Sequence, residues 1–383
     1  MNRVGNRREF LKASAMAGGA LSLGVTPGIL SASLAGAGGG VTRPLPARKL
    51  RMLILGGTGF IGPHMVRYAV ERGHEVTLFN RGRSNTDLFP GLENLIGDRN
   101  GDYESLKGRH WDVCMDNNAS EPDWVELSTE FLRDSVDLYF YVSSRSAYAD
   151  LSSVPMTADA PTFTYETAGV EPGAETLPYG LRKAICERQV QSVFPDRSTV
   201  FRPGLIIGPG DNTDRFTYWP VRIHRGGEVL SPGDPTDTVQ IIDARDLTEW
   251  MVRMAEAGHT GVYNGVGPAI PRPMDQLLYG IRAVTTAETI FTWVPEPFLR
   301  EQGVRPYSDM PVWMPPLPGR EGFAKFDLTP EVEKGLTYRS LAATTRDTLE
   351  YHFARPPEER QNLRAGMDPE REARVLAAWH AVR

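Results

Sequence analysis

The chain has 383 residues, 40% of them hydrophobic and 23% charged, with a formal net charge of −6. This balance is typical of a globular protein with two domains or one large α/β domain, and it excludes a disordered chain, a collagen and a bundle of membrane helices. Two cysteines exclude a disulfide scaffold and a cysteine-rich zinc site, and the negative charge argues against a general nucleic-acid-binding surface.

The first 37 residues differ from the rest, because four basic residues precede an uncharged stretch of Ala, Gly, Ser and Leu. Residues 6–12, NRREFLK, resemble a twin-arginine export signal, and residues 35–37, AGA, offer a cleavage site. An uncleaved membrane anchor and a chance basic amphipathic start are the alternatives, but Gly, Ser and Pro interrupt the apolar run, which would span a bilayer poorly. We therefore expect the twin-arginine translocase as a partner and a location in the periplasm or elsewhere outside the cytoplasmic membrane. Loss of residues 1–37 would change the net charge from −6 to −9.

A linker rich in Gly and Pro at 38–49 leads into alternating strand and helix signals. Apolar runs predict strands at 52–55, 75–79, 94–96, 111–115, 138–142 and 199–201, and periodic segments predict helices at 60–71, 122–133 and 179–193. The alternation indicates an α/β fold over residues 50–265, a Rossmann-type doubly wound parallel sheet with helices on both faces. Residues 266–383 are expected to form a smaller C-terminal region for substrate binding and packing.

The turn between the first strand and the first helix contains the sequence GGTGFIG, which satisfies both GxxGxxG and GxGxxG. Glycines there let backbone amides approach a pyrophosphate at the positive end of a helix. A turn without a ligand is the alternative, and the strand–turn–helix context argues against it. The predicted cofactor-binding residues are Gly56, Gly57, Thr58, Gly59, Phe60, Ile61 and Gly62.

The end of the second strand bears on the choice of cofactor, since NAD sites usually offer Asp or Glu there to the adenosine ribose. This chain has Asn80, Arg81 and Arg83 instead, and a guanidinium suits a 2′-phosphate. NADP is therefore slightly favoured over NAD, with a solvated basic turn as the alternative. Asp98, after the third strand, is expected to touch the adenine.

The candidate catalytic residues are Ser144, Tyr179 and Lys183. Tyr179 and Lys183 lie four residues apart and so share one face of a helix, where an ammonium favours the phenolate. A tyrosine with a pKa of about 10 is otherwise a poor base at neutral pH. Ser144 follows a predicted strand and can hold the reacting oxygen. A pair of surface residues is the alternative.

These residues resemble the extended short-chain dehydrogenase/reductase superfamily, in particular its NAD(P)-dependent nucleotide-sugar epimerase/dehydratase group, over residues 50–265. The resemblance implies that Ser144, Tyr179 and Lys183 form the catalytic triad and that Asn117 lies near the nicotinamide ribose. The matching stretches are 53–62, 142–148 (VSSRSAY), 179–183, 202–204 with 208–211, and 241–246.

The chain departs from that pattern directly after Ser144. Dehydratases of the group place Asp and Glu there, because elimination of water needs an acid and a base, whereas this chain has Arg145 and Ser146. Dehydration is therefore disfavoured, which leaves epimerisation or carbonyl reduction. Arg145 could meet an anionic substrate, and a structural or surface role is the alternative.

A small, sugar-like substrate is expected at residues 211–219, DNTDRFTYW, in a loop near 205–235. Asp211, Arg215 and Trp219 are the candidates, since arginine can pair with an acidic group and tryptophan can stack on a sugar ring. Aromatic packing on the core is the alternative. The seven histidines show no ligand spacing, so no metal is expected. A homodimer is a further expectation for the protein.

The expected export favours some reactions over others, because no obvious pool of enzymes or reductants outside the membrane would regenerate a spent dinucleotide. An epimerase returns the hydride within each turnover, so it needs no external regeneration of its cofactor. The alternative function is a non-catalytic dinucleotide-binding protein, possible by resemblance of residues 79–82, FNRG, to the family's chloroplast stem-loop RNA-binding branch. An acidic mature chain argues against RNA as a partner.

Overall fold

The computed structural model describes residues 45–117 and 120–383. The predicted signal at 1–37 and the linker residues 38–44 lie outside the described residues. Within these ranges, a seven-stranded sheet has the order β11-β6-β5-β4-β1-β2-β3, and every neighbouring pair is parallel. The strands are β1 (Arg51–Leu55), β2 (Glu75–Asn80), β3 (Glu93–Ile96), β4 (Trp111–Asp116), β5 (Val136–Val142), β6 (Ser198–Pro203) and β11 (Gly261–Gly265).

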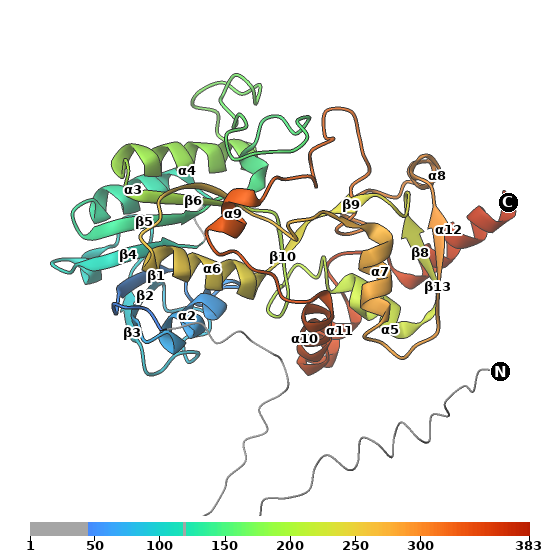
Figure 1. Cartoon of the computed structure of the whole chain (residues 1–383), viewed down its shortest axis with the longest axis horizontal. Helices are drawn as coiled ribbons and strands as arrows, with labels where there is room; N and C mark the ends of the chain where they lie inside the picture. Colours follow the sequence, from blue (N-terminus) through green and yellow to red (C-terminus); the bar gives the residue numbers. More distant parts are fainter. Residues whose placement is uncertain (1–44, 118–119) are drawn as a thin grey trace, which may run out of the picture. The chain divides into compact units, whose positions relative to one another are not determined.

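Helices cover both faces of this sheet (Figure 1). On one face lie α2 (Gly62–Glu71) and α6 (Ala244–Glu256), and on the other lie α3 (Pro122–Leu132) and α4 (Tyr179–Val193). Alternate residues of β1 show why its sequence is continuously apolar: Met52 and Ile54 pack in the core with α2 and α6, whereas Leu53 and Leu55 pack in the core with α3 and α4. The predicted Rossmann-type α/β fold is confirmed.

Most of the remaining helices and strands lie to one side of this sheet (Figure 1), and a second hydrophobic core lies among them. It is built around the parallel pair β8 (Gly227–Pro232) and β13 (Thr289–Val294), with α5 (Tyr218–Arg225), α7 (Met274–Arg282) and α12 (Pro369–Ala381). Residues 205–241 therefore contribute to this core together with residues after 266. The other elements are η1 (Glu104–Leu106), η2 (Arg145–Ala147), β7 (Leu205–Ile207), β9 (Thr238–Val239), β10 (Ile241–Asp243), β12 (Arg272–Pro273), α8 (Glu296–Glu301), α9 (Thr329–Glu333), α10 (Leu341–Ala354) and α11 (Pro357–Gln361).

The chain returns to the first core at α9 and the residues after it. The Glu331 carboxylate accepts a hydrogen bond from the backbone amide of Asn264 in β11, at 2.6 Å. Leu336 is buried in the core beside α6, and Arg339 forms ion pairs with Asp243 and Glu249. The two cores are therefore connected by more than one crossing of the chain. In the part of the chain that is described, no helix is long and apolar enough to span a membrane.

A buried ion pair holds α4 against β6. Arg202 Nη2 lies 2.7 Å from Glu187 Oε2, and the two side chains are only 7% and 4% exposed. Glu187 also accepts a hydrogen bond from the Ser143 hydroxyl. The Arg202 guanidinium lies 4.7 Å from the centroid of the Tyr148 ring. One pair thus joins a helix, a strand and the segment that follows β5.

Replacing one partner of this pair should be costly. In Glu187→Gln the charge of Arg202 stays buried without a counter-charge, so we expect the free energy of unfolding to fall by roughly 3 kcal/mol. Denaturant titration followed by circular dichroism measures it. Arg188→Gln is the matched control, because this neighbour on α4 is exposed, and its effect should stay within about 0.5 kcal/mol. Equal stability of the two variants would contradict the role given to the pair.

Candidate active site

A cavity of about 560 Å³ is lined by the segments that follow the carboxyl ends of β1, β4, β5, β6 and β7. In a doubly wound sheet, ligands bind at this edge, where the strand order reverses between β1 and β4. The cavity brings together most of the residues singled out in the sequence, which are Gly56, Gly59, Phe60, Ile61, Gly62, Asn117, Ser144, Arg145, Tyr179, Lys183, Asp211 and Arg215.

A second cavity, of about 320 Å³, shares Gly56 and Gly59 with the first. Five of the residues predicted to bind the cofactor also line it, namely Thr58, Asn80, Arg81, Arg83 and Asp98. The two cavities therefore meet at the glycine turn, and together they run from the end of β2 to the start of α4. An extended ligand with its middle at the turn fits this arrangement.

Two predicted residues lie elsewhere. Gly57 lines neither cavity, and a Cβ atom there would come within 2.7 Å of Leu78 Cδ2, so it allows close packing of the turn on β2. Trp219 is fully buried in the second core, and its Nε1 donates to the Pro311 carbonyl at 2.7 Å. The structure thus places Trp219 in the packing of the second core, and Trp219 lines neither cavity.

The glycine turn is tight on one side and open on the other. Gly56 has a φ of 82°, in the left-handed region. A Cβ atom on Gly62 would lie 2.5 Å from the Gly56 carbonyl oxygen, whereas one on Gly59 would meet nothing within 4 Å. No side chain caps the N-terminus of α2, so the amides of its first turn are available to an anion in the cavity, except at Pro63, which has no N–H.

The candidate catalytic side chains lie on one wall of the larger cavity. Ser144 follows β5, and its hydroxyl accepts a hydrogen bond from the amide of Ser146 at 3.1 Å. Burial raises the pKa of Tyr179 above its ordinary value, while a hydrogen bond with Ser144 and the charge of Arg215 oppose that rise. The Tyr179 side chain lines the larger cavity and is 45% exposed.

Lys183 lines the same cavity and is almost fully buried. Its ammonium donates to the Val142 carbonyl at 2.7 Å and lies 4.6 Å from the centroid of the Tyr141 ring. Burial lowers the pKa of Lys183 to about 8. The contact with the end of β5 fixes the lysine beside the strand that carries Ser144.

Tyr307 was missed by sequence reasoning although it lines the same cavity. It is not glycine, yet it has a φ of 63°, a conformation that costs about 1–3 kcal/mol and often occurs at functional sites. Its hydroxyl accepts a hydrogen bond from Arg145 Nη2 at 3.0 Å. The sequence analysis predicted only a region for substrate binding and packing at 266–383, and no residue pattern marks Tyr307 within it.

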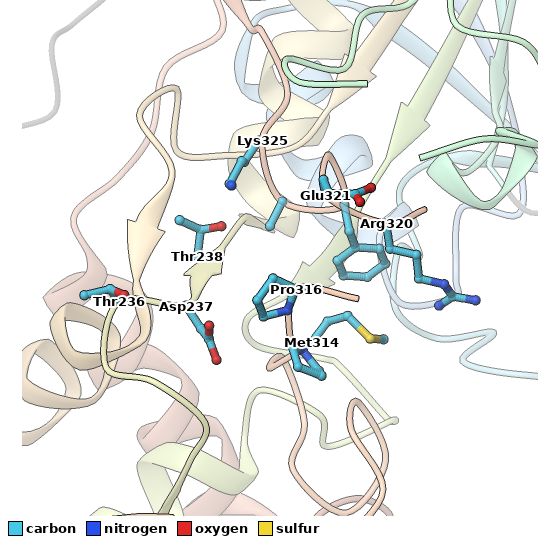
Figure 2. A pocket seen from close by; sticks show the side chains of 11 residues that line it. Thr236, Asp237, Thr238, Met314, Pro316, Arg320, Glu321 and Lys325 are labelled. Atoms are coloured by element: carbon cyan, nitrogen blue, oxygen red, sulfur yellow. The ribbon is translucent and has the colours of Figure 1, made fainter. Parts of the chain in front are cut away.

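A further cavity, of about 190 Å³, lies between residues 236–238 and the segment 314–325 (Figure 2). Arg320, Glu321 and Lys325 border it, opposite Asp237 and Thr238. Phe323 also lines it, and the centroid of the Phe323 ring is 3.9 Å from Arg145 Cζ. One aromatic side chain therefore connects this cavity with the wall of the candidate active site.

Within the described ranges, no group of three or more His, Cys, Asp or Glu side chains could hold a metal ion.

Comparison with known proteins agrees with the placement of these motifs. Residues 52–99 and 124–265 match the NAD dependent epimerase/dehydratase family. These two stretches contain the glycine turn, Ser144, Tyr179 and Lys183. The resemblance inferred from the motifs is therefore supported over the region that forms the sheet and the candidate site.

The chain spans about a third to a half of the length of the curated relatives that it matches. It is 35% identical over 122 residues to a chloroplast stem-loop binding protein of 41 kDa from Arabidopsis thaliana, which is 27% of this chain and 32% of that protein. It is 29% identical over 169 residues to UDP-glucose 4-epimerase from Neisseria meningitidis serogroup B, which is 36% of this chain and 46% of that enzyme.

Among solved structures, the enzyme WbmH of Bordetella bronchiseptica, determined in complex with NAD+, has the same fold. The TM-score is 0.58 with 14% identity, and the alignment covers 80% of this chain and 99% of that one. At this level of identity the likeness shows the fold alone. It extends beyond the parallel sheet into the second core.

Two alanine substitutions separate the structural from the binding role of the turn. Gly62→Ala should destabilise the free protein by about 1–3 kcal/mol, because its Cβ atom would collide with backbone. Gly59→Ala should leave the melting temperature unchanged and weaken dinucleotide binding, because its methyl group would enter the cavity. Thermal unfolding and calorimetric titration with NAD and NADP measure the two effects. Unchanged dinucleotide binding in Gly59→Ala would show that the turn does not hold the ligand.

Proposed function

We propose that this chain is an NAD(P)-dependent enzyme that epimerises or oxidises a sugar-like alcohol by hydride transfer. The observation that carries the proposal is one cavity lined by the glycine turn, Ser144, Tyr179 and Lys183. The match to the NAD dependent epimerase/dehydratase family and to a UDP-glucose 4-epimerase supports it.

The residues present fit a dinucleotide. Gly62 has no room for a Cβ atom, and the amides at the start of α2 are uncapped, as a pyrophosphate site requires. Asn117 Oδ1 is buried at the cavity and has no hydrogen-bond partner among the described residues, so it could accept a ribose hydroxyl. Arg81, Arg83 and Asp98 would surround the adenosine end.

The mechanism follows from the three catalytic side chains. When bound, the nicotinamide cofactor supplies a hydride acceptor. Tyr179 would remove the proton of the substrate hydroxyl, and Ser144 would orient the same oxygen by hydrogen bonding. Lys183 would stabilise the phenolate charge through its buried ammonium. In the reverse direction, Tyr179 would return the proton to the carbonyl oxygen.

The rest of the cavity favours epimerisation or carbonyl reduction over dehydration. Arg145 and Ser146 line it directly after Ser144, where elimination of water needs an acid and a base. Asp211 Oδ2 is buried there without a partner and could accept a second substrate hydroxyl. A polyhydroxylated substrate would satisfy it.

We further propose that the protein is exported by the twin-arginine route with its dinucleotide bound. The support is the sequence of residues 1–37, which the structure does not describe. A cofactor that stays bound through each turnover suits an epimerase. The hydride taken from the alcohol returns to the carbonyl intermediate formed by its removal, so the cofactor is regenerated within the cycle.

A non-catalytic role in RNA binding is the second candidate, and the match to the chloroplast stem-loop binding protein favours it. Filter binding of a structured RNA at low and moderate salt distinguishes the two, since a phosphate-dependent complex weakens steeply with salt. Tight RNA binding together with an absence of turnover would replace the enzyme proposal.

Tyr179→Phe tests the mechanism. It keeps the ring and deletes the group that transfers the proton, so turnover should fall by roughly 10² to 10⁴ while cofactor affinity stays the same. The assay follows nicotinamide absorbance on addition of a panel of nucleotide sugars and free sugars. Lys183→Met should cause a comparable loss, and the two losses should not add, because the pair acts as a unit. Near-normal turnover by Tyr179→Phe would exclude the assignment.

The cofactor choice is tested at the end of β2. Arg81→Ala combined with Arg83→Ala should weaken NADP binding more than NAD binding, because only NADP carries the 2′-phosphate that a guanidinium can bind. Both side chains line the smaller cavity and are exposed. Calorimetric titration of the double variant with each dinucleotide gives the ratio, and equal losses would remove the preference for NADP.

A further inference from the structure

Arg145 differs from the other buried arginines of the protein. Among the described residues, four arginines are buried, which are Arg72, Arg145, Arg202 and Arg222. Three of them form ion pairs with glutamates, which are Glu256, Glu187 and Glu372 respectively. No carboxylate among the described residues lies within ion-pair distance of Arg145, which is 6% exposed. A buried charge without a counter-charge is costly, so Arg145 calls for an explanation.

The contacts of Arg145 hold the guanidinium in place without neutralising it. Nη1 donates to the Phe323 carbonyl at 3.1 Å, and Nη2 donates to the Tyr307 hydroxyl at 3.0 Å. The guanidinium also lies over the Phe323 ring, with Cζ 3.9 Å from its centroid. These partners are uncharged. They orient the group and offset part of its desolvation, and they leave its net charge of +1 in the wall of the cavity.

Three cations and one carboxylate line the cavity, namely Arg145, Lys183, Arg215 and Asp211. Thr213 bridges Arg215 and Asp211, since its hydroxyl accepts a hydrogen bond from Arg215 Nε and donates one to Asp211 Oδ1, so the single carboxylate lies next to Arg215. Lys183 serves the phenolate in the proposed mechanism. Arg145 therefore lines the cavity one residue after Ser144 with a charge that no carboxylate of the described residues pairs with.

We propose that the substrate carries a carboxylate close to its reacting hydroxyl and that Arg145 binds this carboxylate. The inference rests on the proposed function, since it names the chemical class of the alcohol as a hydroxy acid, with sugar acids included. A carboxylate supplies one negative charge and two coplanar oxygens, which suit the charge and the planar fork of a guanidinium. A phosphate monoester would bring close to two negative charges to one unmatched cation.

The test is a binding measurement that does not depend on turnover. Tyr179→Phe protein loaded with NAD is titrated calorimetrically with matched pairs, glucuronate against glucose and galacturonate against galactose, and with 3-hydroxybutyrate and lactate. We expect the acids to bind roughly 10- to 100-fold more tightly than the neutral sugars, the factor that a charge-assisted hydrogen bond supplies. Arg145→Met in the same background should abolish that preference, and Arg145→Lys should retain part of it.

Stability separates a binding role from a structural one. Methionine fills a similar volume without the buried charge, so Arg145→Met should leave the melting temperature unchanged or raise it. Arg320→Met is the matched control, because Arg320 borders the neighbouring cavity of Figure 2 and is exposed. This control should keep the preference for acids.

Four outcomes would overturn the proposal. The first is no preference for any acid in the parent protein, and the second is a preference that survives in Arg145→Met. A preference lost only in Arg320→Met would assign the anion to the neighbouring cavity. Tighter binding of glucose 6-phosphate than of glucuronate would assign a phosphate. Because binding is measured in a catalytically silenced background, failure of the hydride-transfer mechanism would show separately, as lack of turnover by the wild-type protein.

Discussion

The arrangement of the candidate site depends on the buried ion pair between Glu187 and Arg202. Glu187 lies on the same helix as Tyr179 and Lys183, and Arg202 lies in the strand beside β5, which leads to Ser144. The glutamate also accepts the Ser143 hydroxyl, directly before Ser144. The ion pair and the hydrogen bond from Ser143 therefore help to fix the position of Ser144 relative to α4, which carries Tyr179 and Lys183. A helix with Tyr and Lys four residues apart would not by itself be held against the serine in this way.

Much of the fold and of the site could be predicted, for one physical reason. Strands buried on both faces give unbroken apolar runs, and the ends of β1, β4 and β5 meet at one edge of a parallel sheet. The polar residues that follow these runs, among them Asn117 and Ser144, are thereby brought together from distant parts of the sequence. The predicted first helix began at residue 60, but the turn occupies residues through 61 because Gly62 must approach Gly56.

The residues that the sequence did not reveal lie in irregular segments. Tyr307 and Phe323 belong to stretches without a helical or strand period, where only tertiary contacts decide which ring faces a cavity. Trp219 shows the opposite case, since its neighbours Asp211 and Arg215 line the cavity while its indole is buried. The same aromatic residue types occur in hydrophobic cores and in binding sites, so the sequence alone could not tell which aromatic side chains line the cavity.

The return of the chain through α9 adds residues distant in the sequence to the first core. The backbone carbonyl of Lys334 accepts a hydrogen bond from Trp250 Nε1, and Leu336 packs in the first core. Arg339 forms ion pairs with Asp243 at the end of β10 and with Glu249 in α6. A segment from the C-terminal third is thus built into the half that contains the seven-stranded sheet. The core beside the sheet is therefore completed only by residues beyond position 330, and a chain shortened before that point would leave the Asn264 amide and the packing surface of α6 uncovered.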